Sequence, residues 1–125
     1  MNILIIHTAF IGDIVLSTAL VSKVKEKYPD SDIYYLTTPL GKEILKNNNI
    51  DIISVDPPRK GLDKKVVDTI IKSNIKKVVY VSCNGATLTR DLKLFIDGGF
   101  ELKKVKLCDM FSKTAHCEVV VFISR

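Results

Sequence analysis

The stretch Lys77-Val-Val-Tyr-Val-Ser-Cys-Asn-Gly-Ala-Thr-Leu-Thr-Arg-Asp-Leu-Lys-Leu-Phe-Ile-Asp97 places a valine-rich segment directly before a helical one. Lys77–Ser82 is typical of a buried strand, because β-branched side chains fit a pleated sheet that is covered on both faces. Residues 86–97 are the expected helix, which Gly98 and Gly99 end. A strand followed at once by a helix predicts an α/β protein.

The same alternation extends in both directions from this stretch. Apolar residues recur at spacings of three and four in the segment 13–28, which predicts a helix there. Segments 100–107 and 117–124 are two final strands with no helix between them, so we expect them to pair antiparallel. The remaining expected strands are Asn2–His7, 33–37 and 50–55, and the remaining expected helices are 39–47 and 63–73.

This alternation predicts a single α/β domain over residues 1–125, with a Rossmann-like, doubly wound, mostly parallel sheet of six strands and helices on both faces. The segment 50–55 is almost continuously apolar, which favours a central place beside Asn2–His7. Numbered along the chain, the expected strand order is 2-1-3-4-6-5, with the last strand antiparallel.

Composition limits the compartment and the partners. No apolar run approaches the ~20 residues of a membrane span, and Met1 leads directly into a strand without a basic segment or cleavage site, so we expect no signal peptide. Three cysteines do not make a disulfide framework, which favours the cytoplasm. We expect no metal site. The sequence leaves the oligomeric state open, although exposed sheet edges are compatible with a dimer.

Positive charge is concentrated in the second half of the chain. Residues 1–53 hold 5 Lys and Arg against 6 Asp and Glu, and residues 54–125 hold 14 against 8; together these give the net charge of +5. A basic second half suggests contacts with a polyanion such as RNA. The alternative is a set of solvated lysines on helix faces.

Three residues at expected strand ends are candidates for chemistry. Cys83 lies between a strand and a helix N-terminus, where a thiolate is stabilised; the alternative is a packed, inert cysteine. Asp56 is held by Pro57 and Pro58 in an extended turn, which could also be just a stiff loop. Glu118 begins an otherwise apolar strand, where partial burial would suit a general base; the alternative is a solvated strand end.

Together these residues belong to a larger pattern. From residue 55 to 122 the chain resembles the C-terminal part of the S-adenosylmethionine-dependent RNA (uracil-5)-methyltransferases. Five motifs in order carry the resemblance: Asp56-Pro57-Pro58-Arg59-Lys60-Gly61-Leu62-Asp63, Val79-Tyr80-Val81-Ser82-Cys83-Asn84, Ala86-Thr87-Leu88-Thr89-Arg90-Asp91, Asp109-Met110-Phe111 and Thr114-Ala115-His116-Cys117-Glu118. One departure is Gly85, where the family usually has proline.

The resemblance implies a covalent mechanism. Cys83 would add to C6 of a uracil and make C5 able to accept a methyl group, and Glu118 would then remove the C5 proton. Asp56 would lie beside the methyl donor and the target base. The resemblance and the charge make three further residues candidates for RNA contact: Arg59, Lys60 and Arg90.

Residues 1–53 resemble a different family, the N-terminus of the lipopolysaccharide heptosyltransferases. The stretches that carry this resemblance are Ile3-Leu4-Ile5-Ile6, Ile11-Gly12-Asp13-Ile14-Val15-Leu16-Ser17-Thr18, Lys27-Tyr28-Pro29-Asp30 and Leu36-Thr37-Thr38-Pro39. By this resemblance Asp13 corresponds to the base for a sugar hydroxyl; the alternative is an acid favoured by the helix dipole. The sequence thus predicts a chimera of one heptosyltransferase-like half and one methyltransferase-like half, joined near residues 50–55.

The join predicts poor cofactor affinity. A methyltransferase of this type needs a glycine-rich loop after its first strand, but here residues 7–13 contain one glycine, Gly12, and a bulky Phe10. Thr37 and Thr38 stand where an acid for the ribose is expected. Gly12, Asp56 and Pro57 remain as weak cofactor-binding candidates.

Three hypotheses follow from the sequence. The first is a methyltransferase-like enzyme domain that keeps its nucleophile and base but binds S-adenosylmethionine poorly and is inactive as it stands. The second is a catalytically inert α/β chimera. The third is a sugar-binding fragment of a heptosyltransferase, without the domain that binds the nucleotide-sugar donor.

Overall fold

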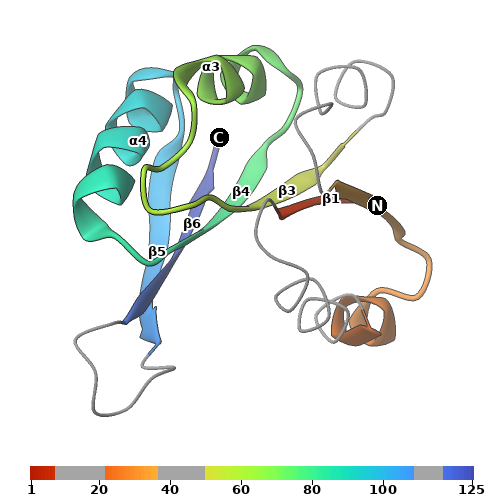
Figure 1. Ribbon diagram of the computed structural model, residues 1–125. Helices are drawn as coiled ribbons and strands as arrows, with labels where there is room; N and C mark the ends of the chain where they lie inside the picture. The colour runs from red at the N-terminus through yellow and green to blue at the C-terminus, as the bar shows by residue number, and fades with distance from the viewer. Residues whose placement is uncertain (8–21, 37–49, 109–116) are drawn as a thin grey trace.

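The computed structural model describes residues 1–7, 22–36, 50–108 and 117–125 (Figure 1). The expected helix 39–47, most of the expected helix 13–28, and the candidates Gly12 and Asp13 lie outside these residues; residues 22–27 are helical. The elements are β1 (Asn2–His7), β2 (Asp32–Leu36), β3 (Ile52–Asp56), α3 (Lys64–Lys72), β4 (Lys77–Ser82), α4 (Gly85–Asp97), β5 (Glu101–Cys108) and β6 (Glu118–Ser124).

The six strands form one sheet in the order β2-β1-β3-β4-β6-β5, as the sequence predicted. The strands from β2 to β4 run parallel, and β6 runs antiparallel to both β4 and β5. The placement of β3 is also confirmed, since Ile53 pairs with Leu4 of β1 on one side and with Val78 of β4 on the other. Each of these three side chains is completely buried, which is why an apolar run marks a central strand.

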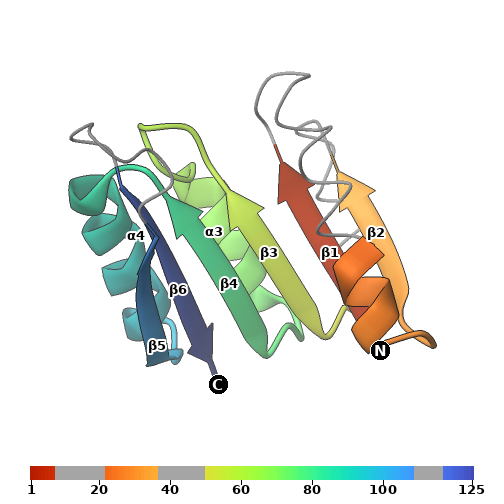
Figure 2. The same ribbon diagram turned by 90° about the horizontal axis from the view of Figure 1, so that it is seen from below.

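Helices lie on both faces of the sheet. Figure 2 shows α3 and α4 on one face and the helix of residues 22–27 on the other, beside β1 and β2. The core lies between the sheet and the α3–α4 layer, where Tyr80, Phe95 and Phe100 are fully buried. The rings of Phe95 and Phe100 meet edge to face, with centroids 5.6 Å apart, so the end of α4 and the residue before β5 are packed together.

The last residue of the chain closes the end of α3. The Arg125 guanidinium donates hydrogen bonds to the backbone oxygens of Ile71 (2.8 Å), Ile75 (3.0 Å) and Ser73, and it lies 4.6 Å from the ring centre of Phe100. These carbonyls lie at or just beyond the helix end, where they lack helical partners. Arg125 therefore acts as a C-terminal cap supplied from β6.

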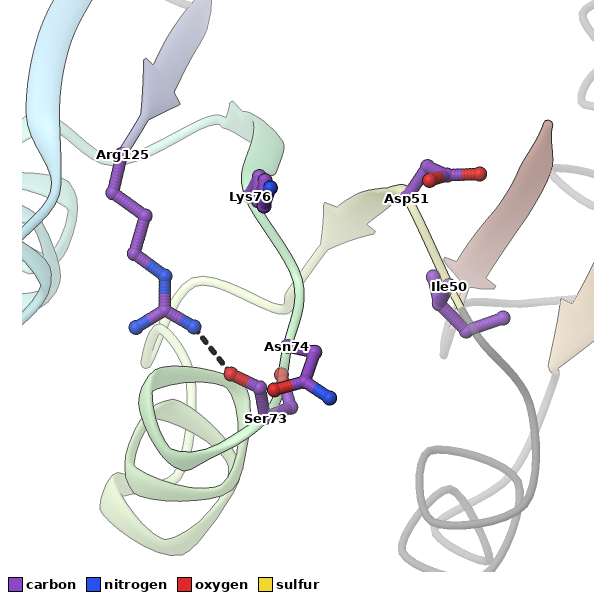
Figure 3. A pocket seen from close by; sticks show the side chains of 6 residues that line it. All are labelled: Ile50, Asp51, Ser73, Asn74, Lys76 and Arg125. Atoms are coloured by element: carbon purple, nitrogen blue, oxygen red, sulfur yellow. Dashed lines mark hydrogen bonds between the residues drawn. The ribbon is translucent and has the colours of Figure 1, made fainter.

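Arg125 also borders a pocket (Figure 3). The pocket lies at the amino-terminal ends of β3 and β4, because Asp51 and Lys76 directly precede these strands. The lining residues are Ile50, Asp51, Ser73, Asn74, Lys76 and Arg125. Ligands of doubly wound sheets bind at the opposite, carboxyl-terminal edge, so this pocket is separate from the edge where the sequence predicts chemistry.

We expect Arg125→Ala to lower the free energy of unfolding by about 1–2 kcal/mol, because the end of α3 loses its hydrogen-bond donors and Phe100 loses its cation contact. Lys76→Ala is the matched control, because Lys76 is an exposed cation on the rim of the same pocket and its loss should change stability by less than about 0.5 kcal/mol. Urea unfolding followed by circular dichroism measures both. Equal effects of the two substitutions would contradict the capping role.

Candidate active site

Three candidate residues meet at one edge of the sheet. Asp56 is the last residue of β3, and Cys83 directly follows Ser82, the last residue of β4. Glu118 is the first residue of β6, which runs antiparallel to β4, so its start lies at the same edge. Ser82 of β4 pairs with Val119 of β6. Cys83 follows Ser82 and Glu118 precedes Val119, so the two residues are the next pair at this edge. The topology therefore brings a thiol and two carboxylates together.

The two carboxylates also lie on the same face of the sheet. Tyr80 pairs with Val55 of β3 and with Val121 of β6, and all three are buried in the core under α3 and α4. Side chains alternate between the two faces along a strand. Asp56 is one residue after Val55 and Glu118 is three residues before Val121, so both lie on the opposite face.

The electrostatics of Glu118 agree with this placement. Its partly buried position raises the pKa of the Glu118 carboxyl above the ordinary 4.5, and the negative charge of Asp56 raises it further. Both effects disfavour the charged form. A carboxylate with a raised pKa holds a proton more readily than an exposed glutamate, which is the property of a general base that accepts a proton from carbon.

Cys83 is exposed at a tight turn between β4 and α4. The turn is fixed by Ser82 and Asn84: the Asn84 N–H donates to Ser82 Oγ (3.1 Å), and the Ser82 hydroxyl donates to the Asn84 carbonyl (3.0 Å). Asn84 is also the N-cap of α4, since its side-chain oxygen accepts from the N–H of Ala86 at 3.0 Å. The thiol thus stands at the positive end of a helix, as the sequence predicted.

The loop that follows Asp56 packs against the start of α4. Pro57 is buried, whereas the side chains of Arg59 and Lys60 are exposed. The carbonyl of Arg59 accepts hydrogen bonds from Asn84 Nδ2 (3.2 Å) and Thr87 Oγ1 (3.1 Å). The backbone of the loop is therefore attached to the N-terminal part of α4, next to Cys83, while its two cationic side chains are exposed.

Arg90, the third candidate for RNA contact, has partners within the protein. Its guanidinium is hydrogen bonded to Asp91 Oδ1, by Nε at 2.8 Å and by Nη2 at 2.6 Å, and Nη2 also donates to the carbonyl of Lys60 at 3.0 Å. The side chain is 53% exposed. This geometry gives Arg90 a role in holding the loop, and RNA contact by the same side chain stays a prediction.

Two residues of the site were missed in the sequence, Tyr80 and Asp91. Asp91 is fully buried, and its Oδ2 accepts from the Tyr80 hydroxyl (2.6 Å) and from the N–H of Leu62 (2.8 Å). Burial, together with the hydrogen bond to Asp91 and its charge, raises the pKa of Tyr80 well above its ordinary value, so the phenol stays protonated as a donor. The sequence held one sign of this role: Asp91 lies seven residues after the Asn84 cap, which puts a carboxylate on the buried side of α4.

Several residues singled out in the sequence lie outside the part of the chain that the structure describes. The cofactor candidate Gly12 and the sugar-transfer candidate Asp13 lie outside the described residues, as do Phe10, Thr37 and Thr38. Among the residues that the structure describes, no group of three or more His, Cys, Asp or Glu could hold a metal ion. No helix in the described ranges is long and apolar enough to cross a membrane.

The fold and this edge define the chain as a Rossmann-like α/β domain, a class in which the carboxyl-terminal strand edge carries the ligands. The chain belongs to the tRNA (uracil-5-)-methyltransferase family, whose family model matches residues 38–125. An uncharacterized RNA methyltransferase of Fusobacterium nucleatum is 46% identical over 98 residues, which cover 75% of this chain and 21% of the relative. One from Listeria monocytogenes is 53% identical over 73 residues, or 58% of this chain and 16% of the relative.

Solved structures show the same fold. The tRNA (uracil-54, C5)-methyltransferase of Pyrococcus abyssi, in complex with S-adenosyl-L-homocysteine, is similar over 98% of this chain and 29% of its own, with a TM-score of 0.64 and 24% identity. TrmK of M. capricolum, in complex with S-adenosyl-homocysteine, is similar over 99% of this chain and 62% of its own, with a TM-score of 0.55 and 16% identity. The chain spans about a fifth of the length of the curated relatives that it matches.

The methyltransferase similarity extends upstream of the expected join at residues 50–55. The family match begins at residue 38, and the 98-residue alignment with the Fusobacterium relative is longer than the 72 residues from 54 to 125. The heptosyltransferase resemblance of residues 1–53 and the chimeric origin of the chain stay predictions.

A substitution at Gly61 tests how closely the loop and α4 approach each other. Its φ of +79° is in the left-handed region, and a Cβ there would lie 2.6 Å from both Arg90 Nη2 and Asp91 Oδ2. We expect Gly61→Ala to lower the free energy of unfolding by about 2 kcal/mol or more, from backbone strain and steric overlap. Gly85→Ala is the control, because the space around Gly85 is open and, at the first position of α4, the substitution should change stability by less than about 0.5 kcal/mol. Thermal unfolding measures both, and a neutral Gly61→Ala would show that the approach is loose.

The coupling of Asp56 to Glu118 can be measured directly. We expect Asp56→Asn to lower the pKa of Glu118, because the neighbouring negative charge is removed; the pKa should stay above 4.5, because burial remains. A pH titration of side-chain carboxyl carbons by NMR gives the value. Asp97→Asn, at the far end of α4, is the control and should leave the Glu118 titration unchanged. An unchanged pKa in Asp56→Asn would mean that the carboxylates do not interact.

Proposed function

We propose that this chain carries the uracil-activating part of an RNA (uracil-5-)-methyltransferase, with Cys83 as the nucleophile and Glu118 as the base. The observation that supports the proposal most strongly is the pairing of Ser82 with Val119, which sets the exposed thiol and the glutamate at adjacent ends of β4 and β6. Membership in the uracil-5 family supports the same assignment. The whole enzyme's activity is part of this proposal, because the chain spans only a fraction of its relatives.

The chemistry needs a thiolate and a proton acceptor on one uracil ring. The thiolate of Cys83 adds to C6, and the electron pair of the C5–C6 double bond moves onto C5 and the O4 carbonyl. C5 then takes up either a proton or an electrophile. Glu118 removes a proton from C5, the double bond re-forms, and the thiolate leaves C6. Water supplies the proton that C5 takes up, so addition, proton exchange and elimination balance without any other reactant.

Asp56 and the exposed cations complete the proposed site. Burial raises the pKa of Glu118, and the negative charge of Asp56 raises it further. Asp56 also stands at the edge where the target base would lie. Arg59 and Lys60 are exposed on the loop that is attached to Asn84, beside Cys83, and we propose that they contact phosphates on either side of the target uridine. RNA is thus the proposed partner of the basic half of the chain.

S-adenosylmethionine is the proposed cofactor of the family chemistry, and when bound it supplies the electrophilic methyl group. In this chain Asp56 lies in register with His7, the last residue of β1, so Asp56 and Pro57 border the place where a cofactor would approach. The sequence that follows His7 has one glycine in seven residues, which does not fit close approach of a nucleotide to the backbone. We therefore propose weak cofactor binding and derive no step through it.

Proton exchange tests the nucleophile without a cofactor. In deuterium oxide, reversible addition of Cys83 to C6 should replace the C5 hydrogen of uridine in a transfer RNA by deuterium, which mass spectrometry detects. We expect Cys83→Ala to abolish exchange and Glu118→Gln to lower its rate by roughly 10²–10⁴-fold, the usual contribution of a general base.

Cys117→Ala is the matched control, because Cys117 is also an exposed cysteine near the same edge; its exchange should equal that of the wild type. A second arm adds S-adenosylmethionine, where we expect little methylated uridine. Rapid methylation would overturn the proposal of weak cofactor binding. Absence of exchange in the wild type, or exchange that survives Cys83→Ala, would leave the chain as an inert α/β fold.

A further inference from the structure

Asp91 connects three separate parts of the candidate site. Its Oδ2 accepts from Tyr80 of β4, three residues before Cys83, and from the N–H of Leu62, six residues after Asp56. Its Oδ1 accepts two hydrogen bonds from Arg90. A buried carboxylate is costly unless its lone pairs are filled, and here four donors from a strand, a loop and a helix fill them.

Arg90 extends this connection along the loop. Its Nη2 donates to the carbonyls of Lys60 (3.0 Å) and Leu62 (3.3 Å), while Thr87 Oγ1 donates to the carbonyl of Arg59 (3.1 Å). The backbone of residues 59–62 is therefore attached to the first two turns of α4 at several points. The same helix begins at Asn84, directly after the thiol.

The two prolines restrict how Asp56 can move relative to the attached loop. Pro57 and Pro58 each fix their φ angle near −65°, and each restricts the residue before it. Few backbone rotations thus remain between Asp56 and Arg59, so the attached carbonyls limit where the Asp56 carboxylate stands, together with the pairing of Asp56 with His7 in the sheet. A loop of the same length without prolines would absorb a shift at residue 59 by rotating.

We propose that Arg90 and Asp91 are positioning residues, which hold Asp56 in a fixed relation to Cys83 and Glu118 through the attached loop. The inference rests on the proposed function for its kinetic consequences, and neither residue itself touches the reacting atoms. Its alternative is that the Arg90–Asp91 pair only stabilises the fold.

Arg90→Lys is the sharpest test, because lysine keeps the charge but cannot bond Asp91 through two nitrogens and reach the carbonyls at once. We expect three results: faster amide hydrogen exchange at residues 59–62, a lower pKa of Glu118 by NMR as Asp56 moves away, and a roughly 10- to 100-fold lower kcat for uridine C5 exchange with little change in KM. Asp91→Asn should act in the same direction, and Arg90→Lys remains informative if Asp91→Asn does not fold.

Thr89→Ala is the matched control, because the Thr89 hydroxyl bonds only the Gly85 carbonyl of its own helix among the contacts described (2.8 Å); it should leave all three readouts unchanged. If Arg90→Lys lowers stability but leaves the Glu118 pKa and the loop amides unchanged, the pair only stabilises the fold and the inference is wrong. If the wild type shows no C5 exchange, the proposed function fails instead, and the pKa and amide readouts still decide whether the pair positions Asp56.

Discussion

The arrangement of the strand edge depends on one buried charge, the carboxylate of Asp91. It lies under the sheet with no exposed surface, where an unpaired charge would destabilise the fold strongly. Four hydrogen bonds offset this cost, and they come from β4, from the loop after β3 and from α4 itself. Satisfying the charge therefore requires that these three segments meet in one way. The turn that carries Cys83 and the residue Asp56 are both attached to the segments that Asp91 joins.

This constraint has consequences on both sides of Asp91. The loop can approach α4 only because Gly61 has no side chain and accepts a left-handed φ. On the other side, Tyr80 must enter the core with its hydroxyl directed at Asp91, so a polar atom interrupts an otherwise apolar strand. Both features cost stability in isolation, and the network makes them consistent. A site that combines a thiol with a carboxylate needs such a frame, because covalent addition and proton removal depend on the relative placement of two groups.

Much of this fold could be predicted from the sequence, because its signals are local. Lys77–Ser82 was predicted within its observed bounds, and the apolar run around Ile53 correctly placed β3 between β1 and β4. Asp56, Cys83 and Glu118 were each predicted at a strand end, and the observed strand directions bring these ends to one edge of the sheet. The Asp91 network could not be predicted, because it joins residues 29 positions apart whose contact depends on how α4 packs. The same reason explains why Arg90, an evident cation for RNA, turned out to be bonded within the protein.

The topology also separates two tasks within one sheet. The proposed nucleophile and base both come from the ends of the antiparallel pair β4 and β6, whereas the proposed cofactor side is that of β1, whose last residue is in register with Asp56. β3 lies between the two sides of the site. Of its side chains, only the Asp56 carboxylate at its end borders both the proposed cofactor side and the side with Cys83 and Glu118. Sequence change upstream of β3 can therefore alter the proposed cofactor side without touching the turn that carries Cys83, because the hydrogen bonds described for that turn all lie downstream of Asp56. We infer that a domain built in this way can keep the proposed uracil-activating edge ordered even where its proposed methyl donor binds weakly.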